Sequence, residues 1–235
     1  SERIPYSLLR GVSNLGRGRA RREEVEMTAE EMAERIFWLG HDGFRIEGRQ
    51  TVYVDPFQIS GGPTADLVLV THVHYDHCSP DDIDKISGPD TRIVTEKDSA
   101  AKLSGSVQTV QPGSAVTIGD VTVEAVVAYN LNKQFHPKEN GWLGFIVEME
   151  GVRIYHAGDT DFIPEMKTIE ADIALLPVSG TYVMTAEEAV QAALAIGPRL
   201  AIPMHYGAIV GAANDAQRFA AALEGQCPVK ILEPV

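Results

Sequence analysis

The sequence predicts an α/β fold in which two mixed β-sheets pack face to face with helices on the outside. Short runs rich in β-branched and aromatic residues recur between glycine-containing turns, as expected of strands. The run 66–70 is apolar after its first residue, which is typical of a strand buried on both faces. Helices are interspersed with strands in both halves of the chain, and two packed sheets with outer helices accommodate that order.

The expected helices carry recognisable start signals. Thr28 is followed three positions later by Glu31, a capping box that predicts a short helix. Ser79 and Pro80 are expected to cap and start the next helix, which two aspartates in its first turn favour. The expected helices are 28–35, 80–86, 185–196 and 214–223.

The expected strands are separated by turn signals, of which the pairs at 119–120 and 150–151 indicate hairpins. The strand at 66–70 leads directly into a cluster of polar residues, and the carboxyl ends of strands are where α/β folds place their chemistry. The expected strands are 36–39, 43–46, 51–54, 66–70, 92–95, 107–110, 115–118, 121–127, 143–149, 152–156, 173–176 and 200–203.

Length and composition favour one domain preceded by a short arm. With 235 residues and 44% hydrophobic content, the chain can bury a large core in a single domain. We expect this domain to span residues 28–235, after an N-terminal arm of residues 1–27. The arm contains a basic segment, 17–22. It is interpreted either as a solvated arm that could join a homo-oligomer, or as a contact for an anionic partner.

The overall charge and the cysteine content exclude several classes of protein. A net charge of −13 argues against nucleic-acid binding, which depends on Lys and Arg. A small-molecule substrate is therefore expected. No apolar run is long enough to span a membrane and no secretory signal is recognised, so we predict a cytoplasmic protein. Two cysteines are too few for a disulfide framework or a cysteine zinc site, so His and Asp must bind any metal.

Residues 72–77 have the pattern HxHxDH, directly after the buried strand at 66–70. In an extended turn alternate residues face the same way, so His72 and His74 can hold one ion while Asp76 and His77 turn toward a second. Imidazole and carboxylate ligands suit zinc, and also manganese, iron or nickel. Three imidazoles packed together without an ion would be costly whenever one was protonated.

This pattern resembles the first metal motif of the metallo-β-lactamase superfamily. Two later segments resemble further motifs of that superfamily in the same order. The resemblance implies that Asp159, in the sequence Gly-Asp-Thr at 158–160, bridges both metals, and that His205 is the last histidine ligand. It covers residues 36–235 and implies the αββα sandwich of the superfamily.

The third histidine ligand has two candidates. In relatives such as glyoxalase II the ligand lies just before a strand that precedes the Gly-Asp-Thr turn, and His136 fits that place. His156 is the alternative, although its position at a strand end favours a core role or contact with another ligand. We therefore predict that His136 is the ligand.

Other residues are weaker candidates for the site. The segment 38–41 resembles one that lines the site in the UlaG-like branch, which includes ascorbate-6-phosphate lactonase and N-acyl-phosphatidylethanolamine phospholipase D. His41 is thus expected either to line the site or to be hydrogen-bonded elsewhere. Asp55 is either a turn residue or a partner that orients a ligand. Tyr182 either lines the substrate pocket or packs within its loop.

The predicted function is hydrolysis by a binuclear metal centre. Two cations about 3.5 to 4 Å apart can bind one water, lower its pKa and present hydroxide to a substrate. Asp76 would orient this hydroxide as the catalytic carboxylate. Known members of the UlaG-like branch cleave lactones or phosphodiesters, so the expected substrate is a small anionic ester, lactone or phosphodiester.

Three alternatives use the same fold. A di-iron redox enzyme resembles HxExDH, and here His74 occupies the Glu position. A nuclease is disfavoured by the acidic charge and by the lack of a Lys- and Arg-rich segment to clamp nucleic acid. A non-catalytic scaffold subunit is disfavoured by the complete ligand set.

Overall fold

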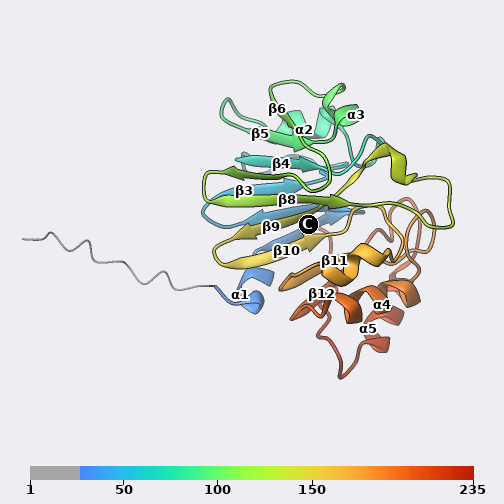
Figure 1. The fold of residues 1–235 in the computed structure, drawn as a ribbon. Helices are drawn as coiled ribbons and strands as arrows, with labels where there is room; N and C mark the ends of the chain where they lie inside the picture. Colours follow the sequence, from blue (N-terminus) through green and yellow to red (C-terminus); the bar gives the residue numbers. More distant parts are fainter. Residues whose placement is uncertain (1–26) are drawn as a thin grey trace, which may run out of the picture.

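The computed structural model describes residues 27–235. These residues form two six-stranded β-sheets, with helices packed on the outside (Figure 1). The predicted fold class is therefore confirmed. The basic segment 17–22, with the rest of the predicted arm before Met27, lies outside the described residues.

The first sheet has the strand order β1-β2-β3-β4-β5-β6. Strands β1 to β3 are antiparallel, whereas β3 to β6 run parallel. The segments that follow β3 and β4 therefore leave the sheet at the same edge. The strands are β1 (Ile36–Gly40), β2 (Gly43–Glu47), β3 (Thr51–Val54), β4 (Leu67–Val70), β5 (Arg92–Thr95) and β6 (Ser106–Thr109).

The second sheet has the strand order β12-β11-β10-β9-β8-β7. Strands β7 to β10 form an antiparallel meander, and β10, β11 and β12 are parallel. Because they are parallel, the carboxyl ends of β10 and β12 lie at the same edge of the second sheet. The strands are β7 (Ala115–Ile118), β8 (Val121–Val127), β9 (Leu143–Met149), β10 (Val152–His156), β11 (Ile173–Pro177) and β12 (Leu200–Met204).

The helices cover the outer faces of the sheets. Helix α4 contacts β11 and α5, and α5 also contacts β12, while α3 lies beside β6 (Figure 1). The sequence did not predict α3, η1 or η2. The helices are α1 (Ala29–Ala33), α2 (Pro80–Ile86), α3 (Lys97–Ala100), α4 (Ala186–Ile196) and α5 (Ala213–Ala222), with 3-10 turns η1 (Lys138–Asn140) and η2 (Pro164–Thr168).

The two predicted helix starts have different outcomes. The capping box of α1 is present, because Glu31 N donates to Thr28 Oγ1 and Thr28 N donates to Glu31 Oε2. Ser79 is the N-cap residue of α2 and Pro80 its first residue, as predicted, but the Ser79 side chain makes no capping hydrogen bond. Its hydroxyl donates to the buried carboxylate of Asp82, with 2.7 Å between Oγ and Oδ2.

Strand β4 shows why its sequence is continuously apolar. Leu67 and Leu69 belong to the main core between the sheets, which also contains Phe145 of β9. Val68 and Val70 point the other way, into a second cluster with residues of α2. All four side chains are fully buried. A strand buried on both faces therefore delivers the polar turn that follows it to the edge of the sheets.

The longest described helix, α4, has 11 residues. None of the described helices has the length and apolar character that a membrane crossing requires.

Candidate metal centre

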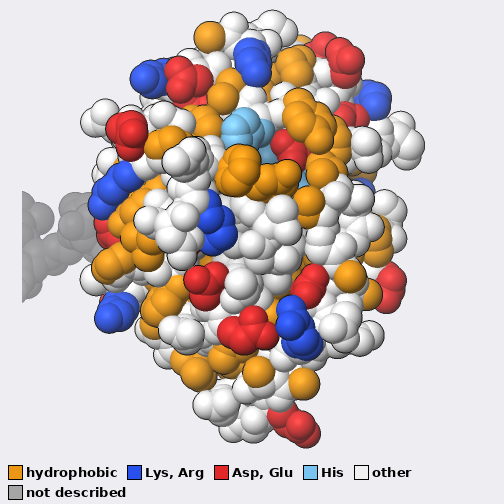
Figure 2. Space-filling model, turned by 90° about the vertical axis from the view of Figure 1, so that its right-hand side faces the viewer, with side chains coloured by type: hydrophobic (Ala, Val, Ile, Leu, Met, Phe, Trp, Pro, Cys, Tyr) orange, Lys and Arg blue, Asp and Glu red, His pale blue; other side chains and the backbone are white. Residues whose placement is uncertain are grey.

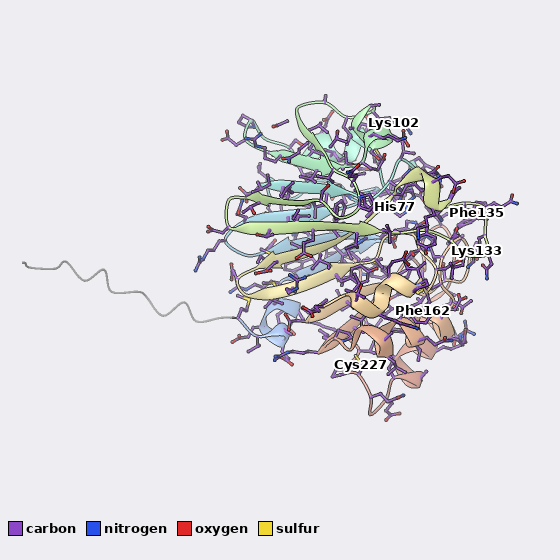
Figure 3. All side chains as sticks on the ribbon, in the orientation of Figure 1. His77, Lys102, Lys133, Phe135, Phe162 and Cys227 are labelled. Atoms are coloured by element: carbon purple, nitrogen blue, oxygen red, sulfur yellow. The ribbon has the colours of Figure 1, made fainter. Side chains whose placement is uncertain are left out.

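The predicted ligands converge at one edge of the two sheets, on turns that follow or precede strands. Figure 3 shows His77 at these strand ends. The turn after β4 carries His72, His74, Asp76 and His77, the loop before β9 carries His136, the loop after β10 carries Asp159, and His205 directly follows β12.

Three histidines form the first half of the cluster. One ring nitrogen from each of His72, His74 and His136 lies within 4.8 Å of those of the other two. The Nε2 atom of His72 is 2.9 Å from the Nδ1 atom of His74. The ring of Trp142 packs against both, with ring centres 4.8 Å apart in each case. These three imidazoles can hold one ion.

Asp159 lies between these histidines and the second half of the cluster. Its Oδ2 atom is 3.0 Å from His136 Nε2 and 3.4 Å from His205 Nε2. Its Oδ1 atom is 3.5 Å from His77 Nε2, which in turn lies 3.9 Å from Asp76 Oδ2. One carboxylate therefore faces histidines of both groups.

Asp55 orients the imidazole ring of His77. The Nδ1–H of His77 donates to Asp55 Oδ2 at 2.8 Å, which leaves Nε2 to face Asp159. Asp55 also accepts hydrogen bonds from the backbone N and the hydroxyl of Thr71, at 2.8 and 2.5 Å. The carboxylate of Asp55 is fully buried, so these donors provide the compensation that a buried charge requires.

Two more histidines are oriented in the same way. The Nδ1–H of His136 donates to Asn130 Oδ1 at 3.1 Å. The Nδ1 of His205 lies 2.9 Å from the hydroxyl of Ser179, which itself donates to a backbone carbonyl, so the histidine is the donor. In both rings the Nε2 atom is left to face Asp159. Such partners set the tautomer that a metal ligand needs.

The chemistry of the cluster fits a metal ion. The Nε2 atoms of His77 and His136 and the Oδ1 atom of Asp159 are buried and have no hydrogen-bond partner within the described residues. Buried polar atoms without partners are rare and costly in native proteins. In the neutral rings the single protons are committed to Asp55 and Asn130, so these lone pairs face one another, and a cation is the partner that satisfies them all.

Burial lowers the pKa of His72 well below its usual value and also lowers the pKa of His74, so both rings are neutral at neutral pH, as metal binding requires. Burial alone would also lower the pKa of His77 and His205, but Asp159 and the other nearby carboxylates outweigh it. The pKa of His77 is raised well above its usual value and that of His205 to about 9, so an ion bound by these two rings displaces their protons. Burial alone would raise the pKa of Asp159, but the neighbouring His205 and His77 rings outweigh it. The pKa of this carboxyl lies well below its usual range, and Asp159 is ionised.

The structure separates the two candidates for the third histidine ligand. His136 joins His72 and His74, as described above. His156 is buried beneath the cluster, and both of its ring nitrogens are already used. Its Nε2–H donates to the Asp42 carbonyl at 2.9 Å, and its Nδ1 accepts from Gly158 N at 3.2 Å. This arrangement favours His136 over His156 as the third histidine ligand.

A pocket of about 250 Å³ opens onto the cluster. Tyr182 forms part of its wall, and Figure 2 shows hydrophobic side chains beside the histidines on this face of the molecule. None of the described residues that line it is Lys or Arg. The pocket is lined by His74, Tyr75, Asp76, Phe135, His136, Asp159, Tyr182 and Ile209.

Residues 35–205, more than two thirds of the chain, match the β-lactamase superfamily domain. The chain belongs to the β-lactamase superfamily. The match begins just before β1 and ends on His205, so it includes every predicted ligand.

Similar proteins are named metal-dependent hydrolases. One from Thermoplasma acidophilum is 36% identical over 217 residues, which cover 85% of this chain and 95% of that protein. One from Thermoplasma volcanium is 34% identical, covering 87% and 99%. The solved structure of a protein described as a metal-dependent hydrolase, from Parabacteroides distasonis, has a TM-score of 0.76 at 32% identity, covering 84% and 93%. This β-lactamase superfamily chain is thus one of the metal-dependent hydrolases. The narrower resemblance to the UlaG-like branch stays a prediction.

Sequence reasoning missed one acidic residue beside the predicted metal centre. Asp42 is fully buried, and neither of its carboxylate oxygens has a hydrogen-bond partner within the described residues. Its Oδ2 atom lies 3.9 Å from His77 Nδ1. Burial raises the pKa of Asp42 well above its usual range, which favours the protonated form. An aspartate in a turn between two strands is more often a surface residue, so its sequence position gave no signal.

Proposed function

We propose that this chain is a binuclear metal-dependent hydrolase that cleaves a small ester, lactone or phosphodiester. The observation that carries the proposal is the position of Asp159, whose Oδ2 atom faces His136 and His205 and whose Oδ1 atom faces His77. A carboxylate placed in this way can contact two ions at once. Metal sites with two ions support hydrolysis without a serine or cysteine nucleophile.

The proposal assigns each predicted ligand to one of two divalent ions. His72, His74 and His136 hold the first ion, Asp76, His77 and His205 hold the second, and Asp159 contacts both. The chemistry that such ions supply when bound is the acidification of water and the neutralisation of negative charge on the substrate. The donor set suits zinc best, with manganese, iron and nickel as alternatives.

Asp76 is assigned the catalytic role among the carboxylates. It lines the pocket and is partly exposed, whereas Asp159 lines the pocket but is buried, and Asp55 is buried outside the lining. Burial would raise the pKa of Asp76, but the nearby rings of His41 and His77 outweigh it, and the pKa lies below its usual value. An ionised carboxylate is a hydrogen-bond acceptor only. Asp76 is therefore suited to orient the attacking water and to accept a proton from it.

The mouth of the pocket supports a substrate with an apolar substituent. Tyr75, Phe135, Tyr182 and Ile209 line it, and all four are exposed. Exposed apolar side chains gathered at a pocket are typical of a binding site. The negative charge expected of the substrate has no Lys or Arg partner among the described lining residues. Any such charge would lie at the bond to be cleaved, next to the ions.

The test is elemental analysis of the purified protein together with a substrate screen. Nitrophenyl esters, an aliphatic lactone and bis(p-nitrophenyl) phosphate are assayed with zinc, manganese, iron or nickel restored. We expect at least one class to be hydrolysed, the activity to disappear with a chelator, and Asp76→Asn to reduce kcat by about 100-fold or more. Asp90→Asn, an exposed change between α2 and β5 and outside the pocket lining, is the matched control.

Two outcomes would overturn the proposal. Full activity of Asp76→Asn with an unchanged metal content would remove the role of Asp76. A coloured, iron-loaded protein that consumes oxygen and hydrolyses none of the three substrate classes would establish the redox alternative instead.

A further inference from the structure

His41 lies on the tight turn between β1 and β2, and the fold holds it rigidly. Its backbone is in the left-handed region, with φ of 50°, and so is that of His205, with φ of 59°. The carbonyl of His41 accepts hydrogen bonds from Trp38 Nε1 at 2.9 Å and from His205 N at 3.0 Å. Non-glycine residues in this region are uncommon and tend to occur at functional sites. The turn therefore places the His41 ring beside the segment that carries His205.

The ring of His41 faces the second half of the cluster. Its centre lies 4.2 Å from that of His205 and 5.4 Å from that of His77. One ring nitrogen from each of these three histidines lies within 4.8 Å of the others. The Nε2 atom of His41 is 3.2 Å from Asp76 Oδ2, and the side chain is almost fully buried. Its Nδ1 atom is buried too, with no hydrogen-bond partner within the described residues.

The distance between His41 Nε2 and Asp76 Oδ2 matches the distance expected between two atoms that bind the same ion. With metal–ligand bonds of about 2.0 to 2.1 Å in a five-coordinate site, neighbouring ligand atoms are roughly 2.9 to 3.6 Å apart. The separation of 3.4 Å between His205 Nε2 and Asp159 Oδ2 and that of 3.2 Å between His41 Nε2 and Asp76 Oδ2 both lie in this range. A hydrogen bond from His41 that merely orients Asp76 has a similar length, so the distance alone does not separate the two roles.

We propose that His41 is a direct ligand of the second metal ion, beside Asp76, His77, Asp159 and His205. This inference rests on the proposed function and adds a ligand to it. Both ions would then have three imidazoles, with the carboxylate of Asp159 between them. Such a nitrogen-rich second site takes a borderline transition ion such as zinc, and discriminates against magnesium and calcium, which prefer oxygen ligands.

The first experiment observes the imidazole nitrogens directly. Protein labelled with ¹⁵N is freed of metal and titrated with zinc alone, and the histidine ring nitrogens are followed by NMR. The His41 signals are assigned by their loss in His41→Gln. We expect the Nε2 resonance of His41 to move to the position of a zinc-bound imidazole, as the Nε2 resonances of His77 and His205 do. His156, which is bonded only to backbone groups, serves as the internal control and keeps its resonances.

The second experiment separates ligation from hydrogen bonding. The amide of His41→Gln can still donate a hydrogen bond to Asp76, but it is a poor metal ligand. We expect the weaker of two zinc-binding steps to lose at least about tenfold in affinity in His41→Gln and in His41→Ala alike. Wild-type zinc affinity in His41→Gln would overturn the proposal, because a hydrogen bond would then be sufficient.

The outcomes also distinguish this inference from the function on which it rests. If zinc binds in two steps and the His41 resonances stay unchanged, only the role of His41 is wrong. If zinc does not bind, the inference about His41 is wrong, and if manganese, iron and nickel do not bind either, the proposed function fails with it. Should the variants not fold, the His41 ring signals are assigned in the wild-type protein by through-bond correlation to its backbone, and the zinc titration of the wild-type protein then decides the question.

Discussion

The Nδ1 atom of His77 lies 2.8 Å from Asp55 Oδ2, and this contact determines which nitrogen of the His77 ring faces Asp159. Asp55 follows β3 and His77 follows β4. Because these two strands are parallel neighbours, the residues that follow them meet at the same edge. Asp55 itself has φ of 43°, so the chain adopts an uncommon backbone conformation at this position.

We predict that Asp55→Asn weakens metal binding. An amide cannot accept all three hydrogen bonds that His77 and Thr71 now donate, so His77 is free to turn or change tautomer. Removing such a partner costs about 10- to 100-fold in metal affinity. Competition with a chromophoric chelator measures this. Asp66→Asn, at the other end of β4 where the carboxylate accepts from Thr51 N, is the control and should bind zinc normally. Equal affinities for the two variants would contradict the prediction.

Metal removal is expected to lower the thermal stability of the protein. Without an ion, the buried Nε2 atoms of His77 and His136 have no partner, and each such group costs free energy in the folded state. At free zinc about 1,000-fold above Kd, binding adds about 4 kcal/mol to the free energy of unfolding, which corresponds to a rise in Tm of roughly 10 °C. Calorimetry with zinc and with a chelator measures the difference, and magnesium is the control ion. The same Tm in all three conditions would argue against a metal centre.

The sequence predicted the convergence of the cluster because its strongest signal is local. Residues 72–77 lie on one turn after one strand, so their proximity does not depend on the rest of the fold. The positions of Asp159 and His205 came from the resemblance to a family, and the parallel order of β10, β11 and β12 explains why they arrive at the same edge.

Apart from Asp55, the residues that orient the predicted ligands could not be predicted, since their positions depend on how loops fold back. Asn130 reaches His136 across a loop of six positions, and Ser179 reaches His205 from 26 positions away.

Helix α3 was missed for a different reason. It has only four residues, too few for a periodic pattern, and its cap is Glu96, a residue type that is not among the usual caps.

Gly158 directly precedes Asp159, and we predict that Gly158→Ala damages both stability and metal binding. Gly158 has φ of 63°, and an added Cβ would lie 2.5 Å from the carbonyl oxygen of Leu143. The backbone would have to shift, and Asp159 with it. Gly197→Ala is the matched control, because Gly197 has φ of 67° but no atom within 4 Å of the added Cβ.

Urea unfolding and zinc titration of the two glycine variants distinguish the cost of a strained backbone from that of a steric clash between the added Cβ and its neighbours. Gly197→Ala should lose about 1 kcal/mol of stability, from backbone strain alone, and keep normal zinc affinity. Gly158→Ala should lose more stability and also bind zinc more weakly. A normal zinc affinity in Gly158→Ala would show that Asp159 does not depend on this turn.

Asp82 is predicted to stabilise α2 in a pH-dependent way. Burial raises its pKa, but the Lys85 ammonium, the Ser79 hydroxyl and the Gln58 backbone N outweigh this, and the pKa lies below the usual 3.8. Since the pKa is lowered by folding, the stabilisation is present above pH 4 and is lost as the pH falls through the lowered pKa.

Asp82→Asn should therefore cost about 1 to 3 kcal/mol at pH 7 and progressively less below pH 4. The exposed neighbour Asp81, in the same first turn of the helix, provides the control variant Asp81→Asn. Denaturant unfolding at several pH values measures both. A cost of Asp82→Asn that does not change with pH would mean that the charge of the carboxylate is not responsible.

The aromatic pair at the mouth of the pocket is predicted to bind the apolar part of the substrate. The rings of Phe135 and Tyr182 are 4.5 Å apart and nearly perpendicular, and both are exposed and line the pocket with Asp76 and His136. Phe135 is labelled in Figure 3. Burying about half of a phenylalanine side chain is worth roughly 1 to 1.5 kcal/mol, which corresponds to about tenfold in affinity. Phe135→Ala should therefore raise KM about tenfold for an ester with a phenyl or hexyl substituent, with little change for the methyl analogue.

Leu194→Ala provides the control for this prediction, because Leu194 is 48% exposed and Phe135 is 52% exposed, but Leu194 lies on α4, outside the pocket lining. It should leave KM unchanged for every substituent. Steady-state kinetics over a series of acyl chain lengths measures the effect, and zinc content confirms that the centre is intact. If Phe135→Ala raises KM equally for methyl and hexyl esters, the pair shapes the entrance without binding the substituent. If it lowers kcat alone, the loop that carries His136 has moved, and the loss lies in the metal centre.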